Sequence, residues 1–443
     1  MRLTELIRAF ALPAAAALAL ASCGTGGGVS TPPPGGGAGV TVRVTDQFGS
    51  PMQASAFAWQ DGDGPWQAAQ AGQSTYSFQP SGARYGFAVR CPGPNGTVHV
   101  YQLTTQDGTS WTVECAADTS AYTASYQVIY DASAVGAVSV DLWDAIYPPG
   151  SSTGPTGTIQ MQNRRPGRQD LVLDAFVNEG GSRRRDAIKV LPDVNVPQGS
   201  PYSITVGAQD RVGRGQGTLQ WSGNIIGVNV HAYYVSPRGT WVQVSAGLGQ
   251  SNTLLFDTLA DLAGGRYLAQ VMSCCGYDGE AGGQLYFKLD TATSYNFTLP
   301  PWWSGLGFSS NPRPGFTGLN YTGFPNLPTK AYVLQVVIED VTSWMATLSL
   351  NWLGSQTSYT FPDLSGISGF PSLSQPVDLW SAAAFAVQLA PGQGQNLRWA
   401  SSLARTQALR RGVGTQQVRS MQGPEPVPGA LEGGGAFRLS DAD

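Results

Sequence analysis

The residue types that most often carry enzyme chemistry are scarce in this chain of 443 residues. It contains only two histidines, His99 and His231. Each lies in a segment that alternates apolar and polar residues, so we expect both imidazoles to face solvent from a β-strand. A Ser–His–Asp site needs a histidine base and a third group that orients it. The sequence therefore predicts no catalytic residues.

Metal chemistry has equally little support in the sequence. Asp61-Gly62-Asp63-Gly64 looks like the start of a calcium loop, but the twelfth residue from Asp61 is Gly72 where such a loop has glutamate. We interpret the four residues as a tight turn between Trp59 and Trp66. Two histidines cannot supply a histidine cluster, so no metal site and no cofactor are predicted.

Carboxylate chemistry remains an alternative. Glycoside hydrolysis uses two Asp or Glu side chains that can come from any part of a fold. The 29 acidic residues are scattered along the chain. A cleft with two facing carboxylates would support a glycan-active hydrolase, and a smooth sandwich surface would count against it.

An aromatic, proline-rich segment around Trp302 and Trp303 is the most conspicuous candidate binding surface. Exposed tryptophans stack on sugars or anchor protein interfaces. Alternatively, these rings fill the seam between two modules where a proline-rich linker crosses. We favour the second interpretation.

The rest of the chain predicts an all-β fold. Charged residues make up only 12%, about half the ~25% of typical soluble domains, while glycine, proline and aromatic residues are frequent. Period-two alternation recurs, for example in Val40–Thr45 and Val138–Trp143. The net charge of −4 gives no electrostatic case for nucleic acid. Arg164-Arg165 and Arg183–Arg185 are interpreted as solvated loops rather than as an anion site.

A weak internal repeat divides this β-rich body. A tryptophan-bearing strand, a polar turn, an aromatic hairpin partner and a strongly apolar strand recur at roughly the spacing of an immunoglobulin-like sandwich. We predict four tandem β-sandwich modules, or two larger ones. The predicted segments are 1–22 signal peptide, 23–39 flexible Gly/Pro linker, 40–117, 118–212 and 213–300 as modules 1 to 3, 301–328 aromatic/Pro-rich linker, 329–412 module 4 and 413–443 disordered tail.

The N-terminus has the layout of a secretory signal. Arg2 and Arg8 flank its start, and a short apolar run ends in Leu20-Ala21-Ser22-Cys23. This tetrapeptide resembles the lipobox of bacterial lipoproteins. The resemblance implies cleavage before Cys23 and acylation of its thiol, which holds the chain to a membrane. Gly24, where Asp would favour the inner membrane, implies the outer membrane if the host has two.

Four cysteines remain. Cys91 and Cys115 each end a strand-like segment, and disulfides persist outside the cytosol, so we expect a Cys91–Cys115 bridge worth ~3 kcal/mol. Cys274 and Cys275 are adjacent. They could form a vicinal disulfide, stay buried and reduced, or cross-link a partner.

Two further segments have less specific patterns. Val42 to Pro51 resembles the opening of prealbumin-like or carboxypeptidase-regulatory-like modules, which implies a sandwich and no particular activity. Residues 397–411 have helical spacing and several arginines, so this stretch is a terminal helix, further strands or a surface-lying segment.

Together these features predict a non-enzymatic lipoprotein of the cell envelope. A tether would present sandwich modules for binding or structural support, with envelope proteins or cell-surface glycan as partners. A carboxylate-dependent hydrolase is the alternative. A substrate-binding lipoprotein for transport is disfavoured, because the chain lacks alternating strands and helices.

Overall fold

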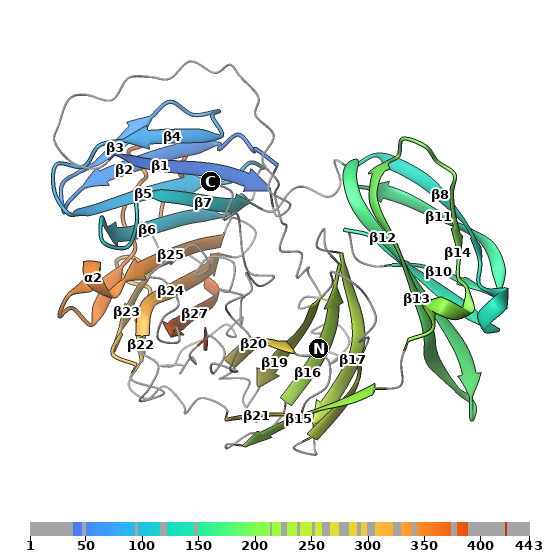
Figure 1. The fold of residues 1–443 in the computed structure, drawn as a ribbon. Coiled ribbons are helices and arrows are strands. Elements are labelled where there is room, and N and C mark those ends of the chain that lie inside the picture. The colour runs from blue at the N-terminus through green and yellow to red at the C-terminus, as the bar shows by residue number, and fades with distance from the viewer. Residues whose placement is uncertain are drawn as a thin grey trace.

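The computed structural model is built almost entirely of β-strands (Figure 1). It describes residues 39–46, 50–93, 96–115, 122–145, 149–212, 215–222, 228–236, 240–249, 253–258, 266–273, 283–289, 294–298, 306–321, 329–338, 343–373, 379–388 and 421–422. The all-β fold with tandem sandwiches is confirmed. The segment 397–411 lies outside the described residues.

The first module consists of seven strands in two facing sheets. Its strands are β1 (Val40–Asp46), β2 (Ala56–Asp61), β3 (Trp66–Ala69), β4 (Thr75–Phe78), β5 (Arg84–Arg90), β6 (Val98–Thr104) and β7 (Ser110–Cys115). One sheet has the order β4-β1-β7, with β1 antiparallel to β4 and parallel to β7. The other has the order β3-β2-β5-β6. The structure confirms that β1 alternates between buried and more exposed residues, since Val40, Val42 and Val44 are fully buried.

The same topology occurs twice more. The second module contains β8 (Ala124–Asp131), η2 (Ser133–Val135), β9 (Ser139–Trp143), β10 (Gly150–Thr153), β11 (Thr156–Arg164), β12 (Gly167–Glu179), β13 (Ser182–Val196), β14 (Tyr202–Thr205) and η3 (Ala208–Asp210). The third contains β15 (Gly215–Ser222), β16 (Val228–Val235), β17 (Trp241–Gly249), β18 (Thr253–Thr258), β19 (Arg266–Ser273), β20 (Gly283–Leu289) and β21 (Ser294–Thr298).

The pairing repeats strand for strand in these two modules. The sheets β11-β8-β14 and β18-β15-β21 match β4-β1-β7, including the parallel pair between the first and last strand. The orders β10-β9-β12-β13 and β17-β16-β19-β20 match β3-β2-β5-β6. The weak repeat in the sequence therefore corresponds to a repeated seven-stranded sandwich. The module boundaries themselves stay a prediction.

The last part of the chain extends the first module. Its elements are β22 (Gly307–Ser309), β23 (Gly315–Thr317), β24 (Thr329–Ile338), β25 (Ser343–Ser349), α2 (Leu350–Leu353), β26 (Ser358–Thr360) and β27 (Leu379–Gln388). Strand β25 pairs in parallel with β6, so one sheet runs through both segments (Figure 1). The small sheet β22-β23-β26 contributes to the same hydrophobic core as the first module.

This arrangement differs from the linker expected at 301–328. In the described part, 306–321, two strands form and four side chains join the core: Leu306, Phe316, Leu319 and Tyr321. The physical reason is that these apolar side chains are buried in one core together with side chains of the first module. In the segment expected to be a disordered tail, β28 (Met421–Gln422) pairs with β20 and β27.

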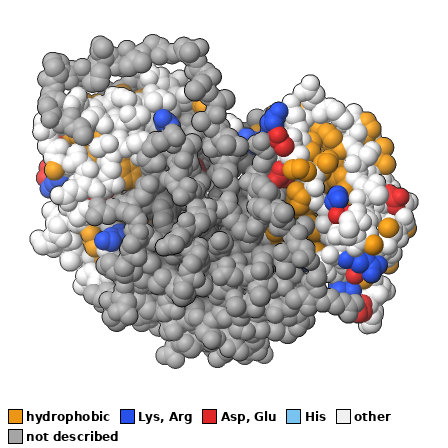
Figure 2. Space-filling model, in the orientation of Figure 1, with side chains coloured by type: hydrophobic (Ala, Val, Ile, Leu, Met, Phe, Trp, Pro, Cys, Tyr) orange, Lys and Arg blue, Asp and Glu red, His pale blue; other side chains and the backbone are white. Residues whose placement is uncertain are grey.

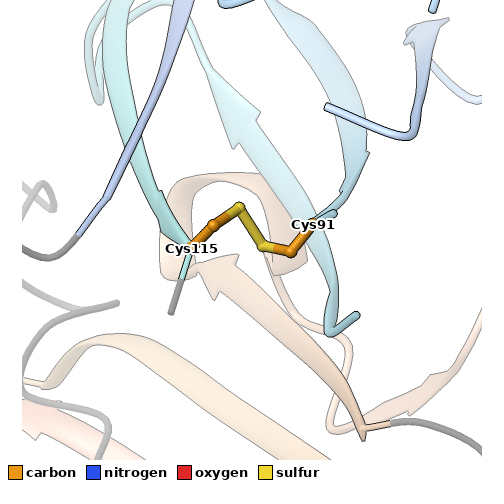
Figure 3. Close-up of a disulfide and its surroundings, with 2 residues drawn as sticks. All are labelled: Cys91 and Cys115. Carbon is orange, nitrogen blue, oxygen red and sulfur yellow. A yellow bond between two sulfur atoms is a disulfide. The ribbon is translucent and has the colours of Figure 1, made fainter. Parts of the chain in front are cut away.

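The predicted disulfide is present. Cys91 at the end of β5 is bonded to Cys115 at the end of β7, with the Cα atoms 5.4 Å apart (Figure 3). The bond joins the two sheets of the first module. Both residues are buried in its core.

His99 does not face solvent as expected from the sequence. It lies on β6, where every residue is buried, and its exposed fraction is 7%. The cause is that His99 shares a face of β6 with Tyr101, whose ring contacts Trp111 of the facing sheet, so this face lies inside the sandwich of the first module. Strand β25 also covers the edge of β6. Burial lowers the pKa of His99 to about 4.

We predict a pH-dependent stability from this residue. The unfolded chain binds a proton at His99 near pH 6.5, whereas the folded chain does so only near pH 4. Stability is therefore complete above pH 6.5 and falls as the pH drops toward 4, by about 2–3 kcal/mol at pH 4.5. Denaturant unfolding at pH 7 and pH 4.5 should show a smaller loss in His99→Gln than in the wild type. Equal losses in the two proteins would contradict this assignment.

Candidate functional site

Among the sequence-predicted site residues, the structure describes Cys91 and Cys115 and joins them in a disulfide. Cys23, Cys274, Cys275, Trp302 and Trp303 lie outside the described residues. The remaining pair, Cys91–Cys115, is a buried structural bridge. Within the described ranges no group of three or more His, Cys, Asp or Glu side chains could hold a metal ion, and no helix there is long and apolar enough to span a membrane.

One serine motif escaped the sequence analysis. Gly150–Gly154 has the Gly-x-Ser-x-Gly spacing of a nucleophile elbow. In the structure this segment is strand β10, which pairs with β9, and not a turn between a strand and a helix. The Ser152 hydroxyl accepts a hydrogen bond from Tyr130 at 3.0 Å, so its role is structural.

The arginine clusters are not the solvated loops expected from the sequence. Arg164 ends β11 and Arg185 lies within β13, and both are buried. Arg164 lies 3.5 Å from Asp144. Figure 2 shows basic and acidic side chains next to one another on this module, without a field of a single sign. Arg164 and Arg185 thus serve as internal partners of carboxylates, whereas Arg183 is exposed.

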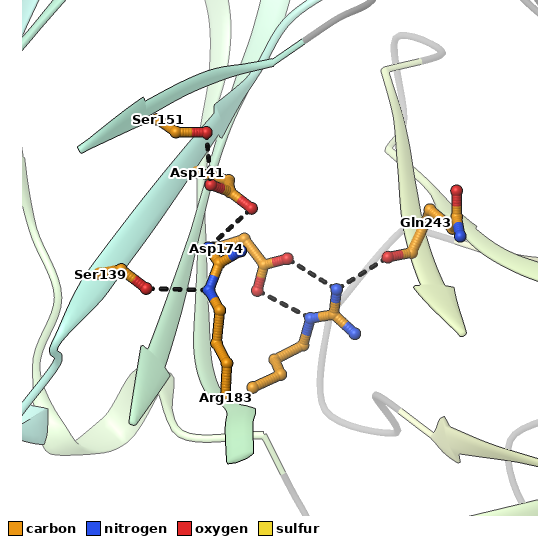
Figure 4. A network of polar contacts seen from close by, with 7 residues as sticks. Ser139, Asp141, Ser151, Asp174, Arg183 and Gln243 are labelled. Carbon is orange, nitrogen blue, oxygen red and sulfur yellow. Dashed lines mark hydrogen bonds and ion pairs between the residues drawn. The ribbon is translucent and has the colours of Figure 1, made fainter. Parts of the chain in front are cut away.

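The best-defined of these pairs is Asp174–Arg185 (Figure 4). The guanidinium donates to both carboxylate oxygens at 2.7 Å, and the Asp174 side chain has no exposed surface. Burial raises the pKa of Asp174, and the Arg185 charge opposes this rise. At the rim, Arg183 contacts Asp141 at 2.8 Å and donates to Ser139 at 2.9 Å.

This pair also links the second and third modules. Arg185 donates a further hydrogen bond of 2.8 Å to the backbone carbonyl of Gln243 on β17. Nearby, the Thr240 hydroxyl donates to the Asp170 carbonyl at 2.7 Å. Val172 and Ile188 on one side, and Val242 on the other, are fully or almost fully buried. We assign the network a structural role in fixing the two modules to each other.

A groove between the first module and the last segment is the candidate binding site. We call it the amide–tryptophan groove, and its volume is about 300 Å³. Ten residues line it: Gln60, Asp63, Trp66, Gln102, Trp352, Gln356, Ser358, Tyr359, Thr360 and Pro362. Four of them come from the first module and six from the last segment, so neither part forms the groove alone.

The floor of the groove is made of two side-chain carboxamides, one on each side of a glycine in the central strand. Gln60 on β2 and Gln102 on β6 flank Gly86 on β5. Gln102 donates to Gln60 at 3.1 Å, and Gln60 donates to the Gly64 carbonyl at 2.7 Å. A Cβ at position 86 would lie 2.9 Å from Oε1 of Gln102, so glycine leaves the room that the amides occupy.

The first wall comes from the β2–β3 hairpin. Trp66 pairs with Gln60 across this hairpin and is half-buried against the core. The turn between the strands is Asp61–Gly64, in which Gly62 has a φ of 56° and Gly64 donates to the Asp61 carbonyl. The interpretation of these four residues as a tight turn is confirmed.

The second wall comes from the short helix α2. Ser349 caps the helix by accepting from the Trp352 amide at 3.0 Å, and Asn351 donates to Asp107 of the first module at 2.7 Å. These contacts place the Trp352 indole beside the groove. The Arg84 guanidinium lies 4.7 Å from the ring centroid of Trp352 and contacts Asp63 at 2.7 Å.

The chemistry of the groove is polar and close to uncharged. Its lining has one carboxylate, Asp63, which Arg84 neutralises, and neither histidine nor cysteine. Burial raises the pKa of Tyr359, so this phenol is neutral at physiological pH. Two-carboxylate glycoside hydrolysis lacks its second group in this lining. The groove is suited to recognition by hydrogen bonds and ring contacts.

The Asp174–Arg185 pair gives a stability prediction. Arg185→Met leaves a buried carboxylate without its cation and should reduce the free energy of unfolding by about 3–5 kcal/mol. Adding Asp174→Leu should recover most of that loss, because the unpaired charge is removed. Arg168→Ala is the control, since its pair with Asp193 is exposed and is worth at most about 1 kcal/mol. Equal losses in Arg185→Met and the control, measured by denaturant unfolding, would refute the role of the buried pair.

No family model matches this sequence, and no curated protein matches it. Solved structures give only distant likenesses. The Bacillus anthracis TIE protein is 9% identical with a TM-score of 0.15, over 59% of this chain and 50% of its own, so the chain spans about half of that protein. A protein from Bacteroides ovatus that is described as an adhesin is 8% identical with a TM-score of 0.17. The match covers 40% of this chain and 92% of that protein. BcpA, the major pilin subunit of Bacillus cereus, is 8% identical with a TM-score of 0.14. The match covers 59% of this chain and 98% of BcpA. Likeness at this level establishes neither a shared fold nor a shared function.

Proposed function

We propose that this chain is an exported binding protein of the cell envelope, anchored by lipid at Cys23, whose binding element is the amide–tryptophan groove. The groove lies on the first module, into which the proposed tether leads, and two further sandwiches of the same topology follow in the chain. Catalysis has no part in this proposal.

The single observation that carries the proposal is the composition of the groove. It combines indole rings with carboxamides and hydroxyls, and two parts of the chain, residues 60–102 and 352–362, build it together. Aromatic rings with a polar neighbour are typical of recognition surfaces. The one carboxylate, neutralised by Arg84, counts against the alternative of a hydrolase at this place.

Anchoring is supported by sequence alone. Leu20-Ala21-Ser22-Cys23 has the lipobox pattern, and a Gly/Pro-rich stretch separates it from β1. Acyl chains bind a membrane through buried methylenes, and two chains give stable attachment. A long polar tether would let the groove reach structures beyond the membrane surface.

Envelope binding tests the role of the groove. The mature chain with Cys23→Ser, which removes the anchor, is mixed with isolated envelope fragments of the host and sedimented. We expect saturable binding that weakens about tenfold or more in Trp66→Ala, because the indole wall is lost. Gln67→Ala is the matched control, since its exposed side chain points to the other face of β3. Equal sedimentation of the Trp66 and Gln67 variants would exclude the groove as the binding element.

Anchoring has its own test. In cells, the wild type should fractionate with membranes and carry the mass of a diacylglyceryl group and a further acyl chain at residue 23. Cys23→Ser should appear in the soluble fraction without this mass, because the acylated thiol is absent. An unmodified wild-type N-terminus, seen by mass spectrometry, would overturn the anchor.

A further inference from the structure

We infer that the amide–tryptophan groove binds an uncharged oligosaccharide, with Trp66 as the stacking wall and the Gln60–Gln102 pair as the polar floor. This inference rests on the proposed function and adds the chemical class of the ligand. It concerns residues 60–102 and 352–362, not the Trp302-Trp303 segment.

The polar groups of the groove match sugar hydroxyls in kind. A carboxamide offers two donor hydrogens and an acceptor oxygen, and a hydroxyl both donates and accepts, as a sugar hydroxyl does. The lining contains three carboxamides, from Gln60, Gln102 and Gln356, and the hydroxyls of Ser358 and Thr360. Gln102 is 4% exposed and bonded to Gln60, so the floor is held in place before a ligand arrives.

The charge balance argues against anionic ligands. The Arg84 guanidinium beside the groove is engaged by Asp63 at 2.7 Å and by the Trp352 ring at 4.7 Å. A second cation, Arg313, acts on Tyr359 and on the carboxylate of Asp363. A phosphate, sulfate or carboxylate ligand would have to displace Asp63 or accept its repulsion. An uncharged ligand meets no such cost.

The walls supply the apolar contact that a sugar ring needs. Since Arg84 covers the Trp352 ring, the indole of Trp66, on the edge strand β3, is the wall assigned to stacking. The face of an aromatic ring packs against the apolar C–H groups of a sugar ring. The sugar hydroxyls around that ring can then form hydrogen bonds with the polar groups of the groove. A volume of about 300 Å³ is at the small end for ligand sites and suits a single sugar unit of a longer chain.

An extended peptide is the competing occupant, because β3 ends its sheet and could pair with an added strand. Such a ligand needs apolar pockets for alternate side chains. The groove offers instead a row of amides and hydroxyls. The observations therefore favour the saccharide.

The test is a titration of the mature Cys23→Ser chain with a panel of neutral oligosaccharides, sulfated and sialylated glycans and unrelated peptides. Calorimetry and tryptophan fluorescence report binding. We expect at least one neutral oligosaccharide to bind, about tenfold more weakly in Trp66→Ala. Gly86→Ala should also weaken it, because its Cβ displaces the amide ends of Gln102 and Gln60 without removing them. Gln67→Ala should bind like the wild type.

The outcomes separate this inference from the proposed function. Absence of any neutral ligand, preference for the charged glycans, or unchanged affinity in both Trp66→Ala and Gly86→Ala overturns the saccharide. If envelope binding still depends on Trp66 but resists competition by neutral oligosaccharides, the proposed function stands and its ligand is of another class. If envelope binding does not depend on Trp66, both fail.

Discussion

The parallel pairing of β6 with β25 is the contact on which the rest of the first module and the last segment depends. It covers the edge of β6, which would otherwise expose unpaired backbone groups. It also aligns the face of the sheet that β22, β23 and β26 bury. The groove and the packing of 306–321 into the shared core both follow from it. Each would change if these two strands separated.

Much of the architecture could be predicted from the sequence, because it is encoded locally. The alternation of Val40, Val42 and Val44 defines a half-buried strand, and the spacing of Cys91 and Cys115 at two strand ends indicates the disulfide. The Asp61–Gly64 turn is likewise a local property of its glycines. The repeat was visible as a recurring order of tryptophan, turn and apolar strand. These features need no knowledge of distant contacts.

The groove could not be predicted because its two halves are distant in sequence. Trp66 and Trp352 were both evident as residues, but only the pairing of β6 with β25 brings their surroundings together. His99 is buried and not exposed as expected, because the facing sheet of its own module covers that face of β6. Arg185 was expected in solvent because a run of arginines usually is, whereas its partner Asp174 lies on the neighbouring strand. Pairing between distant segments thus decided the groove, whereas Arg185 and Asp174 meet across the hairpin of β12 and β13.

The central position of β1 has a mechanical consequence. The proposed tether leads directly into this strand, which has β4 on one side and β7 on the other. A pull along the tether would load both ladders in shear, so their hydrogen bonds would have to break together and not one after another. Strand β7 is in turn bonded to β5 through Cys115 and Cys91, which distributes the load to the second sheet. If the chain is anchored as proposed, the strand that receives the pull is thus held on both sides and linked to the second sheet.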